Sequence, residues 1–168
     1  TPHIVHGNAL RIAWEDVLPA ERCSYVLGNP PFIGKQHQTS AQKADVAPVF
    51  AMIEGGGVLD MVAAWYVKAT LYMQANQAVQ AGLVSTNSIV QGEQVGVLWG
   101  WLLARGVSIR FAHRTFRWSN EASGKAAVHC VVIGFGLRPA TTRTLYEYET
   151  VDGEPHALTA ANINPYLV

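Results

Sequence analysis

The hydrophobic positions of the chain follow two helical patterns and several shorter apolar runs. Apolar residues recur at helical spacing from Val58 to Val79, which predicts the best-defined helix. A second helix is predicted from Gln94 to Arg105, since Gly106 is a residue type that commonly follows the last helical turn. The strand-like runs cover residues 4–10, 26–28, 81–89, 107–112, 126–135 and 144–149. This mixture of helices and strands predicts an α/β domain.

Two stretches lack a clear period. Gly34 to Gly57 is rich in polar residues, and we expect a mobile loop that lies over a substrate. Its last three residues, Gly55–Gly57, lack the Gly-Lys-Ser/Thr sequence of a phosphate-binding loop, so they are predicted to form a hinge. His113 to Lys125 interleaves aromatic and basic residues and is predicted to be a second loop.

The residues with the clearest chemistry follow the apolar run Val26-Leu27-Gly28, which we expect to be a buried strand. They are Asn29-Pro30-Pro31-Phe32. Each proline lacks an N–H group and fixes its own φ, so the strand must end here in a stiff, non-helical corner. A carboxamide, two carbonyl groups and an aromatic ring are thus presented at the carboxyl end of a strand, where open α/β sheets bind their ligands.

This corner suits the methylation of an exocyclic amine on an aromatic base. The lone pair of such an amine is delocalised into the ring, which makes the nitrogen a poor nucleophile. Two acceptors aimed at its N–H bonds, the Asn29 side-chain oxygen and the Pro30 carbonyl oxygen, would draw the nitrogen toward sp³ geometry. Phe32 would stack on the base once it has rotated out of the duplex. The alternative interpretation is a proline-rich turn after an edge strand.

Asn29-Pro30-Pro31-Phe32 resembles the catalytic motif of S-adenosylmethionine-dependent amino-methyltransferases, in the form used by adenine-N6 DNA enzymes. Phe116-Arg117-Trp118-Ser119-Asn120-Glu121-Ala122 and the Gly124-Lys125-Ala126-Ala127-Val128-His129 that follows resemble the methylase part of MmeI-like single-chain restriction-modification enzymes. The resemblance runs from about Gly7 to Phe135, with four segments in the same order. It implies methyl transfer to a flipped adenine in double-stranded DNA, as part of restriction-modification or phage defence.

The resemblance also implies a partial Rossmann-like class I methyltransferase sheet, mostly parallel with an antiparallel last strand, flanked by helices. Such enzymes bind S-adenosylmethionine chiefly through a glycine-rich turn after their first strand, and only 28 residues precede Asn29. We therefore expect residues 1–136 to be the C-terminal portion of a catalytic domain that lacks the first strands. Residues 137–168 are expected to be an extension toward an absent target-recognition region. Alone, this piece should bind the cofactor poorly and have no turnover.

Three residues of this chain match cofactor-site positions of the family. Asn8 lies in a Gly-Asn-Ala-Leu turn near the cofactor adenine, and Asp60 and Trp65 belong to the next motif, whose aromatic residue borders that adenine. Ordinary structural roles compete with each assignment: a turn asparagine, a helix-capping aspartate and a core tryptophan.

Further residues are candidates for contacts with DNA. The resemblance places an aromatic ring on the face of the base opposite Phe32, and Phe116 is the first choice and Trp118 the second. The residues that would anchor phosphates are Lys35, Arg114, Arg117 and Lys125, although solvated charges in a loop are the commoner case. His129 is expected to be a structural histidine of the last strand.

Composition narrows the class of protein. Twelve basic residues balance twelve acidic ones, so we expect most phosphate contacts of the parent protein to lie outside this chain. Cys23 and Cys130 match neither a disulfide framework nor a metal site, and a reducing cytoplasm fits best. The sequence contains no apolar span of membrane length, no signal peptide and no metal-like histidine cluster.

Two other functions remain open at this point. The same amine chemistry could act on RNA adenine or on a protein glutamine amide, although the glutamine enzymes more usually carry tyrosine at the Phe32 position. A non-catalytic scaffold with a methylase-like fold is the third interpretation. The intact Asn29–Phe32 sequence argues against such decay.

Overall fold

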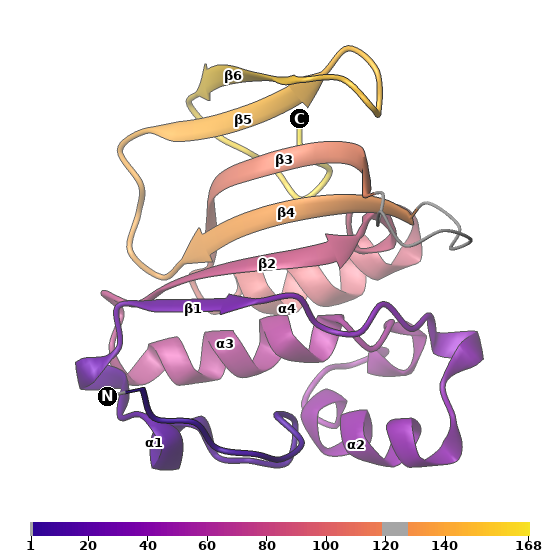
Figure 1. Cartoon of the computed structure of the whole chain (residues 1–168), viewed down its shortest axis with the longest axis vertical. Coiled ribbons are helices and arrows are strands. Elements are labelled where there is room, and N and C mark those ends of the chain that lie inside the picture. Colours follow the sequence, from indigo (N-terminus) through magenta and orange to yellow (C-terminus); the bar gives the residue numbers. More distant parts are fainter. Residues whose placement is uncertain (1, 119–127) are drawn as a thin grey trace.

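The computed structural model describes residues 2–118 and 128–168, and it contains a six-stranded sheet with helices packed on it (Figure 1). The strand order is β1-β2-β4-β3-β5-β6. The strands are β1 (Tyr25–Gly28), β2 (Gln80–Thr86), β3 (Ser108–Trp118), β4 (Val128–Gly136), β5 (Arg143–Tyr148) and β6 (Pro155–Ala160).

The sheet is mixed. β1 pairs parallel with β2 and β3 pairs parallel with β5, whereas β4 pairs antiparallel with both β2 and β3, and β6 pairs antiparallel with β5. β1, β2, β3 and β5 therefore run in one direction, and β4 and β6 run in the other. The expected α/β class with flanking helices is confirmed. The antiparallel strand expected at the end of residues 1–136 is β4. It lies inside the sheet, between β2 and β3.

The helices are α1 (Trp14–Val17), α2 (Ser40–Phe50), α3 (Ala63–Ala75) and α4 (Gly100–Leu103), with single turns η1 (Ala20–Arg22), η2 (Lys35–His37), η3 (Gly56–Val58) and η4 (Asn87–Val90) and a π-helical segment η5 (Val95–Trp99). α3 and the continuous η5–α4 segment are the two predicted helices. α3 begins at Ala63 and not at Val58, because the chain from Asp60 enters it through i→i+3 turns, such as Ala63 N to Asp60 O at 3.1 Å.

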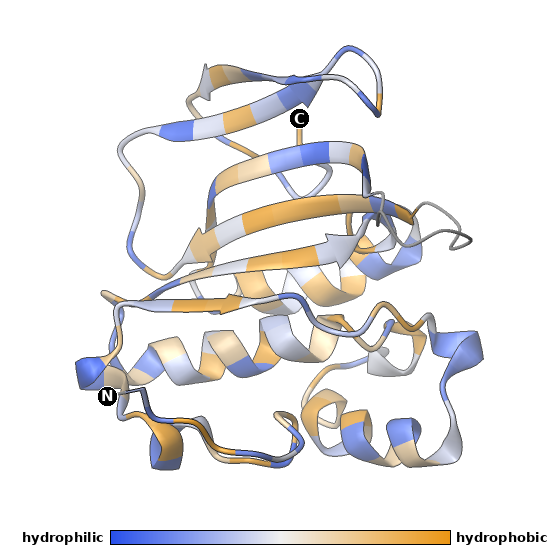
Figure 2. Ribbon diagram, in the orientation of Figure 1, coloured by the Kyte–Doolittle hydropathy of each residue, from blue (hydrophilic) through white to orange (hydrophobic). Residues whose placement is uncertain are grey.

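The core lies between the sheet and these two helices. The Tyr66 ring of α3 stacks on Phe135 of β4 at 5.1 Å, and it meets Trp99 of η5 edge-on at 5.9 Å. The Tyr66 hydroxyl, fully buried, is hydrogen-bonded to Ser85 Oγ at 2.7 Å, so this polar group is satisfied inside the core. Figure 2 shows hydrophobic residues along much of β2 and β4.

β1 is an edge strand, so the prediction of a buried strand at residues 26–28 was wrong. Among the described residues β1 pairs only with β2, and Leu27 and Tyr25 are 79% and 65% exposed. The apolar content of a strand does not show whether the strand is buried inside a sheet or lies at its edge.

Three further predictions of local structure were wrong. Residues 4–10 form no strand, and the chain turns at Asn8. The expected loop over residues 34–57 contains α2, whose first turn is fixed by a capping box between Thr39 and Gln42 and whose pattern is interrupted by Pro48. The expected loop from His113 onward is strand β3 as far as Trp118, because β4 pairs with it along that length; residues 119–127 lie outside the described part.

The C-terminal residues continue the same sheet. β5 pairs with β3 from Phe111↔Thr144 to His113↔Tyr146, and Leu145, Ile163 and Leu167 are buried. Residues 137–168 thus share a core with residues 1–136. That they lead toward a target-recognition region stays a prediction. None of the helices in the described part has the length and hydropathy needed to cross a bilayer.

Candidate active site

The corner formed by residues 29–32 follows the carboxyl end of β1, as the sequence predicts. Parallel pairing of Gly28 with Leu83 fixes the end of the strand. Asn29 and Pro31 are exposed, Phe32 is partly buried and Pro30 is buried. The amide and the ring are therefore accessible, while the first proline anchors the corner in the protein.

Two acceptors at this corner are free within residues 2–118 and 128–168. The Pro31 carbonyl accepts a hydrogen bond from Ile33 N at 3.1 Å. The Asn29 carboxamide and the Pro30 carbonyl make no hydrogen bond with any described residue. The described residues thus leave both the amide oxygen of Asn29 and the carbonyl oxygen of Pro30 without a hydrogen-bond donor.

Asp60 holds the downstream end of the same loop. Its Oδ1 accepts from Lys35 N at 2.8 Å, and the neighbouring Met61 N donates to Ile33 O at 3.0 Å. Its Oδ2 accepts from Ser88 Oγ at 2.7 Å and from Gln94 Nε2 at 2.9 Å. The three protein donors come from the loop after β1, from η4 and from the residue before η5.

A polar cleft of about 630 Å³ opens beside this network. Its walls include Lys35 and His37 on the loop after β1 and Glu93 and Gln94 before η5, with Asp60 between them. The lining residues come from segments that follow β1 and β2 in the chain, and none of residues 29–32 is among them.

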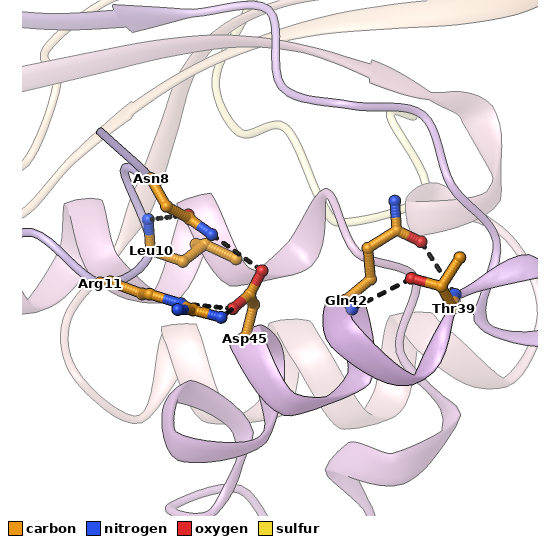
Figure 3. Close-up of polar contacts among 6 residues, drawn as sticks. All are labelled: Asn8, Leu10, Arg11, Thr39, Gln42 and Asp45. Atoms are coloured by element: carbon orange, nitrogen blue, oxygen red, sulfur yellow. Dashed lines mark hydrogen bonds and ion pairs between the residues drawn. The ribbon is translucent and has the colours of Figure 1, made fainter. Parts of the chain in front are cut away.

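Asn8, the candidate for the cofactor adenine, is held in a rigid turn (Figure 3). Its Oδ1 accepts from Leu10 N at 2.9 Å, which is the hydrogen bond of a turn asparagine. Its Nδ2 donates to Asp45 Oδ2 at 2.8 Å, and Arg11 Nε donates to Asp45 Oδ1 at 2.6 Å. The turn role is therefore present, and the second N–H of Nδ2 has no partner among the described residues.

Lys68 clamps the same turn from α3. Its ammonium donates to the carbonyl oxygens of Ala9, Leu10 and Ile12 at 2.8, 3.2 and 2.6 Å. Burial lowers the pKa of Lys68 from its ordinary value. Neither Lys68 nor Asp45 was among the predicted site residues, because a lysine on a helix and an aspartate in a polar stretch carry no signal of such distant partners.

Trp65 is partly buried and packs against the core, which is the structural alternative considered for it. Asp60 does not cap α3 with its side chain, because the residue at the N-cap is Val62. Its carboxylate lies at the acceptor loop. The three candidate cofactor residues are thus not joined by any hydrogen bond between described residues.

The two candidate stacking residues on β3 lie side by side, with 6.1 Å between the rings of Phe116 and Trp118. Phe116 stacks on Tyr148 of β5 at 5.5 Å, and it meets His113 edge-on. Trp118 is 39% exposed. Phe116 is therefore part of an intramolecular aromatic cluster, while Trp118 presents the more accessible ring.

His113 is the polar member of this cluster. Its ring stacks on Tyr146 at 4.2 Å, and its Nδ1 lies 2.7 Å from the Tyr148 hydroxyl. Burial lowers the pKa of His113, and burial, followed by the charge of Glu154, raises the pKa of Tyr148. Both shifts favour a neutral imidazole that accepts a hydrogen bond from the phenol.

The candidate phosphate contacts differ in their surroundings. Arg114 forms an ion pair with Glu147, and Arg117 forms one with Asp152. Phosphate binding at either guanidinium would have to compete with a carboxylate. Lys35 is exposed at the cleft, and Lys125 lies outside the described residues. His129 is exposed on β4. No group of three metal-ligating side chains occurs in the described residues.

Comparisons with known proteins show which family the chain resembles. The model of the family described as MmeI, DNA-methyltransferase domain matches residues 1–147. The DNA methyltransferase A of Bacillus subtilis (strain 168) is 40% identical over 163 residues, which are 96% of this chain and 18% of that protein. A solved structure of the Type IIL restriction-modification enzyme MmeI in complex with DNA matches with a TM-score of 0.96 and 57% identity, over 99% of this chain and 22% of that one. The chain spans about a fifth of the length of these relatives.

Proposed function

The chain belongs to the family of MmeI DNA-methyltransferase domains, and from this premise we propose that it is the substrate-amine half of an adenine-N6 DNA methyltransferase in a restriction-modification system. The observation that carries the proposal is a pair of acceptors at the carboxyl end of β1, the Asn29 carboxamide and the Pro30 carbonyl, that receive no hydrogen bond from the described residues. The partner is double-stranded DNA, bound through the full-length protein.

The corner acts by binding and orientation. Asn29 Oδ1 and Pro30 O accept hydrogen bonds from the two N–H groups of the adenine amine. These hydrogen bonds localise the lone pair of the nitrogen, which then faces the methyl donor. Bound S-adenosylmethionine supplies an electrophilic methyl group. The surplus proton of the methylated amine then leaves to solvent, so no side-chain base is required among these residues.

The residues around the turn at Asn8 fit the cofactor in part. The remaining N–H of Asn8 Nδ2 suits an acceptor nitrogen of an adenine ring, and the bonds from Asp45 and Lys68 keep the turn rigid. Trp65 is the aromatic residue proposed to border the same ring. The remaining contacts to the cofactor are proposed to come from parts of the full-length protein outside this chain.

The flipped adenine is proposed to stack between Phe32 and an aromatic residue of β3. Trp118 supports this role by its exposure, and Phe116 by its position beside it. A cytoplasmic location belongs to the same proposal, because DNA and conditions that keep Cys23 and Cys130 reduced are found together there.

Methylation by the full-length protein tests the proposal. Genomic DNA from cells that express it is digested to nucleosides and analysed by mass spectrometry. N6-methyladenine that disappears with Asn29→Ala is the expected result. Methylcytosine alone would refute the adenine assignment, and methylation confined to RNA or protein would refute DNA as the substrate. Absence of any methylation, with the cofactor bound, would favour the scaffold.

A further inference from the structure

We propose that Asp60 is a positioning residue for the corner at residues 29–32 and not a ligand of the cofactor. The inference rests on the proposed function, because it concerns the loop that would hold the acceptor amine. The family resemblance places Asp60 in the cofactor site. The hydrogen bonds of its carboxylate lead instead to the acceptor loop and to the two segments packed beside it.

The carboxylate of Asp60 is fixed by donors on both oxygens. Lys35 N donates to Oδ1, and Ser88 Oγ and Gln94 Nε2 donate to Oδ2, at 2.7 to 2.9 Å. The exchange is reciprocal, since Asp60 N donates to Gln94 Oε1 at 2.9 Å. Charge-assisted hydrogen bonds of this length fix orientation, so Asp60 joins the segment after β1 to η4 and to the start of η5.

The acceptor loop is thereby held at both ends. Upstream, the pairing of Gly28 with Leu83 fixes where β1 stops. Downstream, Lys35 N is bound to Asp60 and Ile33 O to Met61 N. The two prolines stiffen the residues between. Removal of the Asp60 carboxylate breaks one of these two downstream attachments, and a displacement of roughly 1 Å at a reacting group can cost about 100-fold in rate.

The turn that contains Asn8 has its own supports. Asp45 and Lys68 hold it, and no hydrogen bond joins it to Asp60 within the described residues. Loss of the Asp60 carboxylate should therefore disturb methyl transfer and leave the cofactor turn in place. If Asp60 bound the cofactor directly, loss of its carboxylate would weaken cofactor affinity and leave the rate at saturating cofactor unchanged.

The first experiment measures kcat for DNA methylation and the Kd for S-adenosylmethionine in the full-length protein. Asp60→Ala should lower kcat by about 10- to 100-fold and leave the Kd unchanged. The matched control is Glu54→Gln, which neutralises an exposed carboxylate outside this cleft and should change neither quantity. A weaker cofactor Kd with normal kcat at saturating cofactor would overturn the inference.

A rescue experiment covers the case in which Asp60→Ala fails to fold. In Asp60→Asn the new side-chain N–H faces the Nε2–H of Gln94, so the hydrogen bond between the two side chains is lost. This variant should therefore have a lower kcat. Adding Gln94→Glu provides a matching acceptor, so the double variant should regain most of the lost kcat. If a negative charge at position 60 is needed beside the cofactor, the double variant will be as impaired as the single one. That result would refute the positioning role.

Asn29→Ala in the same assay distinguishes a failure of the proposed function from a failure of the positioning role of Asp60. If Asn29→Ala keeps full methylation, the proposed function itself fails. If Asn29→Ala abolishes methylation while each Asp60 variant retains the kcat of the unmodified protein, only the positioning role of Asp60 fails.

Discussion

The Nζ atom of Lys68 lies 2.6 Å from the carbonyl oxygen of Ile12, and the same ammonium also reaches the carbonyl oxygens of Ala9 and Leu10. A lysine ammonium has three donors, so its bonding capacity is filled by one turn of the backbone. The conformation of the Asn8 turn therefore depends on hydrogen bonds from α3, which lies more than fifty residues further along the sequence.

Lys68→Met should loosen that turn, because it removes the donors and leaves three partly buried carbonyl oxygens in competition for water. We expect a loss of about 2–3 kcal/mol in local stability. Hydrogen exchange of residues 8–12 in the full-length protein measures it. Lys43→Met, an exposed lysine at the start of α2, is the matched control. Unchanged protection in Lys68→Met would contradict the clamp.

Asn8→Asp should weaken cofactor binding, because it sets a second carboxylate against Asp45 at the position where Nδ2 now donates. The double variant Asn8→Asp with Asp45→Asn restores one donor and one acceptor across this contact. Isothermal titration with S-adenosylmethionine should therefore give a raised Kd for the single variant and partial recovery for the double. If the Kd of the single variant equals that of the unmodified protein, this turn takes no part in cofactor binding.

Asn29→Ala should reduce kcat for methylation by about 100- to 1,000-fold, by analogy with the loss of one preorganised polar group at a reacting centre. Cofactor affinity should be unchanged, since Asn29 is free of hydrogen bonds to the described residues and supports no other segment. Single-turnover methylation of a cognate duplex measures the rate. Retention of the full rate would exclude the amide from the reaction.

Trp118→Ala should weaken retention of the flipped base by ~1–3 kcal/mol. Its side chain is 39% exposed, so the melting temperature should fall less than in Phe116→Ala. Phe116→Ala should lower the melting temperature as well, since that ring stacks on Tyr148. Fluorescence of 2-aminopurine at the target position reports flipping. A normal signal in both variants would place the second stacking group elsewhere.

Stability should fall as the pH decreases below about 6.5, the ordinary value for histidine. The pKa of His113 is lowered in the folded state, so the unfolded chain takes up the proton first and is favoured as the pH falls through that range. Above it this contribution is fully present. Melting temperatures between pH 7.5 and 5.5, with His113→Gln as the comparison, measure the effect. An equally steep decline in the variant would assign the dependence to other groups.

Local patterns in the sequence located the strands β2, β4 and β5 and the two main helices, because burial against a core imposes periodic apolar residues on each element. They also located the corner at residues 29–32, since two consecutive prolines end a strand in any context. The helix α2 was missed although Thr39 and Gln42 carry a capping pattern, because Pro48 and the polar residues around it obscured the period.

The sequence by itself located the residues that we propose to carry the chemistry, because an amide followed by two prolines and an aromatic ring is a local arrangement. Only the tertiary structure decided what holds them. The bonds from Asp60 to Lys35, Ser88 and Gln94, and from Lys68 to the turn at Asn8, join segments that lie 25 to 59 residues apart. Such pairings depend on how β1, β2 and α3 pack in three dimensions, and hydropathy along the chain contains no record of them.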